Sequence, residues 1–196
     1  MITLFDLSDL STDAAPIDSQ MLKTRKRMLK SALGDRYAKC KEVIGDINRG
    51  RTIHYVSQGE WSMHDLCVHV LNQIGPAHVT IATWSMSPVG CQVLINQIEA
   101  KQILSINALL DWRVKVRNPE ALQLSKYNFN KIHVDNCHAK VTVLHNDSYH
   151  VSIVGSANYT NNPRIECGVI TEDEGIATFH RTWINQCIDK ASPFQN

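Results

Sequence analysis

Between residues 51 and 190 the spacing of hydrophobic positions changes several times along the chain. Short alternating or continuous apolar runs predict strands at TIHYVS, HVTIATW and ILSINALLDWRVKV, which begin at residues 52, 78 and 103. Helix signals lie between them. Ser62 and Asp65 form a predicted capping box, and Ser87 followed by Pro88 predicts a helix that runs to about residue 101. This order favours an α/β fold with a mixed central sheet flanked by helices.

Two more helices are predicted in the second half of the chain. The segment EALQLSKYNF, from residue 120, has the pattern of a short helix. After Gly175, apolar residues recur at helical spacing and predict a closing helix with Ile176, Phe179, Trp183 and Cys187 on its apolar face.

The first 50 residues differ from the rest in charge. Residues 1–20 contain four acids and no Lys or Arg, whereas residues 23–41 contain eight bases and one acid. From Pro16 the pattern predicts a helix that Gly34 and Gly45 interrupt. We therefore predict an N-terminal extension with a basic helical arm at 1–50 and a main domain at 51–196. The arm either contacts a nucleic-acid backbone or is a solvated helix face. The candidate contacts are Lys23, Arg25, Lys26 and Arg27.

Composition narrows the class of protein. Of 196 residues, 43% are hydrophobic and 20% charged, which is typical of a globular domain, and the apolar runs are too short for a membrane span. The start of the chain carries Asp rather than a basic patch, so we expect no signal peptide, no stable membrane insertion and a cytoplasmic protein. The six cysteines form no CxxC and are predicted to be reduced, and the histidines lack metal-binding spacing. We predict no metal and no cofactor.

The chemistry is predicted to lie in two runs with strand period. In HAKVTVL, Val141 and Val143 point to one face, and His138 and Lys140 point to the other, because successive strand side chains alternate. A neutral imidazole can act as a nucleophile or carry a proton, and an ammonium donates to anionic oxygens.

The second run, HVSIVGSAN, ends in Ser156 and Asn158. Gly155 before them leaves room for a backbone or a ligand. Glu166 follows in a third apolar run, where a carboxylate is costly to bury without a partner. If the two strands are neighbours, their polar groups converge on one spot, where they form a plausible phosphodiester-cleaving site.

The series HxK, GSxN and Glu resembles the HKD motif of the phospholipase D superfamily, in particular its small single-motif nuclease branch. The resemblance covers roughly residues 51–190 and implies a phospholipase D-like fold with a covalent phosphohistidine on His138. It also implies phosphate binding by Lys140 and Asn158, and orientation of the histidine by Ser156 and Glu166. Family members place two motifs at one site. This chain has one HxK, so the resemblance implies a homodimer in which the second His138 protonates the leaving oxygen.

The motif departs from the family at one position. The family has an Asp five residues after the Lys, and this chain has His145 there, with Asp147 two residues further on. In the family that Asp supports the site and does not react. The difference therefore affects the residues that support the reacting groups, and the expected chemistry is unchanged.

Two other features bear on a substrate. Arg113, Lys115 and Arg117 alternate with Val114 and Val116 and indicate either a groove for a polyanion or an exposed strand face. Trp84, at the end of a predicted strand, either borders the site or packs in the core, and core packing is the simpler expectation.

Three functions follow in order of preference. The first is a metal-independent phosphodiesterase, a nuclease that cleaves DNA or RNA. The second is a nucleic-acid-binding module with weak or no turnover, which His145 and the acidic balance of residues 42–196 would fit. The third is a phospholipid-cleaving enzyme, since a fold and a motif do not select the alcohol.

Overall fold

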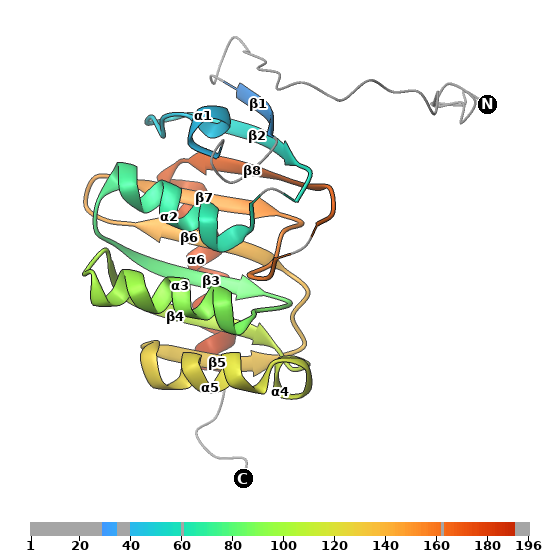
Figure 1. Ribbon diagram of the computed structural model, residues 1–196. Helices are drawn as coiled ribbons and strands as arrows, with labels where there is room; N and C mark the ends of the chain where they lie inside the picture. The colour runs from blue at the N-terminus through green and yellow to red at the C-terminus, as the bar shows by residue number, and fades with distance from the viewer. Residues whose placement is uncertain (1–28, 35–39, 60, 162, 191–196) are drawn as a thin grey trace, which may run out of the picture.

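The computed structural model describes residues 29–34, 40–59, 61–161 and 163–190, with the backbone alone at 29–34. The described strands form one eight-stranded sheet in the order β1-β2-β8-β7-β6-β3-β4-β5 (Figure 1). The strands are β1 (Leu29–Gly34), β2 (Thr52–Ser57), β3 (Ala77–Thr83), β4 (Ile103–Asp111), β5 (Lys131–Asp135), β6 (Lys140–His145), β7 (His150–Gly155) and β8 (Glu166–Glu172). The helices are α1 (Cys40–Ile44), α2 (Met63–Ile74), α3 (Pro88–Glu99), α4 (Val114–Arg117), α5 (Pro119–Asn128) and α6 (Glu174–Asp189).

The sheet is mixed. The pairs β1–β2, β3–β4 and β4–β5 are parallel, and every pairing that involves β6 or β8 is antiparallel. Helices α2, α3 and α5 cover one face and α6 covers the other (Figure 1). The predicted α/β class, with a mixed sheet between helices, is confirmed.

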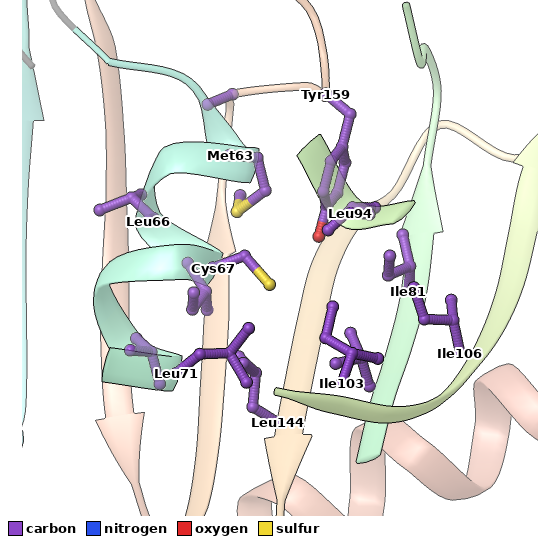
Figure 2. Close-up of a cluster of buried hydrophobic side chains, with 14 of the residues drawn as sticks. Met63, Leu66, Cys67, Leu71, Ile81, Leu94, Ile103, Ile106, Leu144 and Tyr159 are labelled. Carbon is purple, nitrogen blue, oxygen red and sulfur yellow. The ribbon is translucent and has the colours of Figure 1, made fainter. Parts of the chain in front are cut away.

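The main core lies between the sheet and α1, α2, α3 and α5. Figure 2 shows Met63 and Leu71 of α2 beside Leu94 of α3 and Ile81 and Leu144 of the sheet, and all five side chains are buried. Burying one side chain of this size contributes about 1.5–3 kcal/mol, so this layer holds the strands in place. A smaller core under α6 contains Val141 and Val143, the face predicted to point away from His138.

Local signals placed several elements correctly. The Asp65 carboxylate accepts from the Ser62 N–H at 2.8 Å and begins α2, which ends before Gly75, where φ is 79°. The Ser87 hydroxyl accepts from the Gly90 N–H at 3.1 Å and begins α3. These bonds satisfy amide groups that a helix start leaves unpaired.

The strand predicted across residues 103–116 ends early. The Asp111 carboxylate accepts from the Arg113 N–H at 3.0 Å, and Arg117 N donates to Arg113 O at 2.8 Å, so residues 114–117 form the helical turn α4. A short acidic side chain that binds a nearby backbone N–H competes with the sheet ladder. Arg113, Lys115 and Arg117 therefore do not alternate along a strand face.

The helix predicted from Pro16 is wrong at residues 29–34. Residues 29–34 form β1, paired in parallel with β2, because an open strand edge offers a full row of backbone partners that overrides a weak helical pattern. The basic residues predicted to bind nucleic acid, Lys23, Arg25, Lys26 and Arg27, lie outside the described residues.

The buried face of α6 is Ala177, Ile184 and Ile188, with Trp183 and Cys187 at its margin, whereas Phe179 is 66% exposed. No helix in the described part of the chain combines the length and apolar character that crossing a membrane requires.

Candidate active site

The motif residues meet at one end of neighbouring strands in the middle of the sheet. Strand β6 is antiparallel to β7, and β7 is antiparallel to β8. The start of β6, the end of β7 and the start of β8 therefore lie side by side, which confirms that the two motif strands are neighbours. The end of β3 joins them, because Thr83 pairs with Lys140.

His138 lies in the loop just before β6 and is exposed. The Lys140 ammonium donates to the His138 carbonyl oxygen at 2.8 Å, and its Nζ lies 3.5 Å from His138 Nδ1. Burial is the largest cause of a lowered pKa for Lys140. A partly desolvated ammonium beside an imidazole binds an anionic oxygen more strongly than one in bulk water, since screening is weaker.

Ser156 and Glu166 form a pair on neighbouring strand ends. The Ser156 hydroxyl donates a short hydrogen bond to Glu166 Oε2 and accepts from the Cys167 N–H at 3.0 Å. Glu166 is only 9% exposed. The bond from Ser156 gives this buried carboxylate a donor, as its position in an apolar run requires.

Asn158 is held from both sides. Its backbone oxygen accepts from the Met63 N–H at 3.3 Å, and its side-chain Oδ1 accepts from the Thr83 hydroxyl at 3.4 Å. With the amide oxygen engaged, the amide NH₂ is the group suited to donate to a phosphate oxygen.

Gly155 allows the backbone of β8 to lie close to that of β7. A Cβ there would lie 2.6 Å from Cys167 O, and a Cβ on Gly168, its partner in β8, would lie 2.6 Å from the Tyr55 hydroxyl. Two paired glycines thus let the buried Tyr55 ring lie across β7 and β8 beneath the motif.

Asp111 belongs to the site and was not predicted. This carboxylate is fully buried at the end of β4. Its Oδ1 accepts from Arg113 Nε at 2.6 Å, and its Oδ2 accepts from Arg113 Nη2 at 3.1 Å and from the Cys137 N–H at 3.2 Å. The bonds from Arg113 are the largest cause of its lowered pKa. An acid that closes the apolar run INALLD was the available signal.

Trp84 borders the site and is half-buried, so the simpler expectation of core packing is wrong. Its ring centroid lies 5.5 Å from that of His138. Three cations surround the indole: Arg113 Cζ at 5.0 Å, Arg117 Cζ at 5.3 Å and Lys140 Nζ at 5.6 Å from the ring centroid. Such contacts hold long basic side chains close to an aromatic face.

Of the predicted substrate contacts, Arg113 and Arg117 therefore lie beside the motif, and Lys115 is exposed on α4.

His145 does not lie beside the motif. It is the last residue of β6, at the opposite end of that strand, and its ring centroid lies 5.3 Å from that of His78 and 6.4 Å from that of His150.

All six cysteines are free thiols. Within the described ranges, no three His, Cys, Asp or Glu side chains are grouped so that they could hold a metal ion.

Comparison with known proteins gives little more. No family model matches the chain, and no curated protein does. Among solved structures, a polyphosphate kinase from Porphyromonas gingivalis is 9% identical, with 74% of this chain and 27% of that chain covered and a TM-score of 0.49. TrmBL2, described as an archaeal chromatin protein with a novel mode of DNA binding, is 11% identical, with 76% and 55% covered and a TM-score of 0.46. Both similarities are too weak to indicate a function.

Proposed function

We propose that this chain is a metal-independent phosphodiesterase, a nuclease that cleaves DNA or RNA through a covalent phosphohistidine at His138. The observation that carries the proposal is the convergence at one sheet edge of an exposed imidazole, an ammonium, an amide and a hydroxyl–carboxylate pair. The resemblance of these residues to the HKD motif supports the same chemistry.

In the first step a nitrogen of neutral His138 attacks phosphorus, and the bond from phosphorus to the leaving oxygen breaks. Lys140 and Asn158 bind the non-bridging oxygens, where negative charge must be held through the transition state. The leaving oxygen takes a proton from His138 of a second copy, which acts as general acid.

In the second step a water molecule attacks the same phosphorus, and the nitrogen–phosphorus bond breaks. The second imidazole, now neutral, takes a proton from that water. The products are a phosphate monoester and a free hydroxyl, and both histidines return to their starting states. Ser156 and Glu166 fix the strand ends on which the reacting groups stand.

The test is cleavage of single-stranded and duplex DNA, RNA and an aryl phosphodiester by the His138→Ala variant, with and without a chelator. We expect the substitution to abolish cleavage and the chelator to leave wild-type activity intact. His54, an exposed histidine on β2, provides the matched control, and His54→Ala should cleave normally. Cleavage by His138→Ala, or loss of wild-type cleavage with the chelator, would refute the proposal.

A second candidate is a nucleic-acid-binding module without turnover. The cations around Trp84 favour it, because Arg113 and Arg117 suit phosphate contacts whether or not cleavage follows. Salt-dependent binding with no hydrolysis of any of these substrates would establish it. Hydrolysis of anionic liposomes in preference to nucleic acid would instead indicate a phospholipid-cleaving enzyme.

A further inference from the structure

Aromatic rings and a guanidinium follow one another away from the exposed His138. The His138 and Trp84 ring centroids are 5.5 Å apart, and Arg113 Cζ lies 5.0 Å from the Trp84 centroid. The same Arg113 Cζ lies 5.9 Å from the centroid of Trp112. We call the series Trp84, Arg113 and Trp112 the aromatic track. It leads from the proposed nucleophile to the exposed indole of Trp112.

The backbone around the track is fixed. The Trp112 N–H donates to Asp135 O at 2.9 Å, so the residue is anchored between the ends of β4 and β5. The guanidinium between the rings is held by the two oxygens of the buried Asp111. A preordered surface loses less conformational entropy when a ligand binds.

The outer ring is open to a ligand. Trp112 is 49% exposed, although an indole on a globular protein is usually more buried than this. The next turn of chain, α4, adds the exposed bases Lys115 and Arg117. Among the described residues, no salt bridge pairs either base with an acid. The Asp135 carboxylate at the margin of this surface lies 3.9 Å from His133 Nε2.

A single nucleic-acid strand fits this combination. The flat face of a base stacks on an indole or a guanidinium, and bases expose their faces only when they are unpaired. In a duplex the faces are stacked inside, so the phosphates could still meet Lys115 and Arg117 but the indole would gain little. The rings can stack on the bases of a strand while the cations beside them bind the phosphates of the same strand.

We propose that the aromatic track binds unpaired bases on one side of the scissile phosphate, and that the substrate is therefore single-stranded nucleic acid. The inference rests on the proposed function, because the strand on the track is the one whose phosphodiester His138 attacks. The track selects strandedness by stacking, whereas Lys140 and Asn158 hold the phosphate that reacts.

Binding is measured in the full chain with His138→Ala, which keeps the strand intact. The probes are a mixed-sequence single-stranded oligonucleotide, the duplex of the same sequence and anionic vesicles. We expect the single strand to bind more tightly than the duplex. Adding Trp112→Ala should raise the Kd for the single strand about tenfold or more and leave the duplex Kd nearly unchanged, and Trp112→Phe should retain most of the affinity.

Tyr127 provides the matched control, because it is 82% exposed on α5 and lies outside the track. Tyr127→Ala should bind the single strand like its parent. Equal affinity for single strand and duplex, an unchanged Kd in Trp112→Ala, or tighter binding to vesicles would each overturn the inference.

Failure of the two proposals can be told apart. If the wild type hydrolyses no phosphodiester, the catalytic proposal fails, and the binding measurements still decide the role of Trp112. If the wild type cleaves through His138 but Trp112→Ala cleaves single strands with the wild-type kcat/KM, only the aromatic track is refuted.

Discussion

The Asp111 carboxylate connects two parts of the site through one side chain. It orients Arg113, which lies over Trp84, and it accepts from the N–H of Cys137, the residue before His138. Because the carboxylate is buried at the end of β4, it fixes the segment with Arg113 and the loop with Cys137 to the same strand. Asp111 is a positioning residue, since its contacts are with Arg113 and backbone.

Asp111→Asn keeps the size of the side chain and removes its charge. We expect kcat for phosphodiester cleavage to fall roughly 10- to 100-fold, with a smaller change in KM, because the loop that carries His138 loses its anchor. Steady-state kinetics on an aryl phosphodiester measure both constants. Asp147→Asn, at an exposed turn position, is the control and should match the wild type.

A second readout separates positioning from general damage. The folded pKa of Asp111 is lowered below its ordinary value of 3.8, so its stabilisation is present above that value and is lost as pH falls through the folded pKa. Urea unfolding should show a larger deficit for Asp111→Asn at neutral pH than in acid. Equal kcat together with equal pH profiles would remove Asp111 from the site.

Elements with local signals were predictable, and those set by tertiary contacts were not. The capping groups of α2 and α3 and the alternation in β6 and β7 are encoded within a few residues. The sequence of the turn α4 has the pattern of a strand, and the turn is seen only in the hydrogen bond that the Arg113 N–H donates to the Asp111 carboxylate. Strand β1 depends on the open edge of β2, which no local pattern reports.

The site divides in the same way. His138, Lys140, Ser156, Asn158 and Glu166 were predicted because alternation assigns polar residues to one face of each short run and because the order HxK, GSxN and Glu resembles a family motif. Their proximity depended on the motif strands being neighbours, which the pairings of β6 with β7 and of β7 with β8 provide. The contributions of Trp84, Asp111 and Trp112 come from the ends of β3 and β4. They reach the motif because β6 pairs with β3 across a crossover, and a sequence pattern does not give that strand order.

A row of three histidines lies across β3, β6 and β7, at the strand ends opposite the motif. His145 pairs in register with His78 on β3 and His150 on β7, and it lies partly buried under the influence of Arg181. Burial is the largest cause that lowers the pKa of His145 from 6.5 to about 4, and the charges of Arg181, His78 and His150 lower it further. This row is remote from the motif, so it bears on stability.

We expect the folded chain to lose stability between pH 7 and pH 4 because of His145. The folded state keeps this imidazole neutral down to about pH 4, whereas the unfolded chain protonates it near 6.5, so the unfolded state binds more protons in that range. His145→Asn should flatten the dependence of unfolding free energy on pH. Urea denaturation across the range measures it, with His54→Asn as the control, and identical slopes for wild type and His145→Asn would contradict the assignment.

At the scale of the whole molecule, the chain carries one HxK, while the proposed reaction uses two imidazoles at the same phosphorus. One protonates the leaving oxygen while the other forms the bond to phosphorus, and a single ring cannot do both in one step. His138 is exposed in the described chain, so a second copy can approach it. A two-fold symmetric dimer would bring the His138 side chains of both copies to one site, because the same surface of each subunit meets at the axis.

We therefore expect a mixed dimer of one wild-type copy and one His138→Ala copy to be inactive. Each copy would carry a different affinity tag, and two successive purifications would isolate the mixed species after co-expression. Its cleavage of an aryl phosphodiester should be at the background level of the His138→Ala homodimer, because the site lacks either its nucleophile or its proton donor. A mixed dimer with His54→Ala, purified in the same way, should retain full activity. Half of the wild-type activity in the first mixed dimer would mean that each copy acts alone, and so would turnover by a species whose mass in solution is that of one chain.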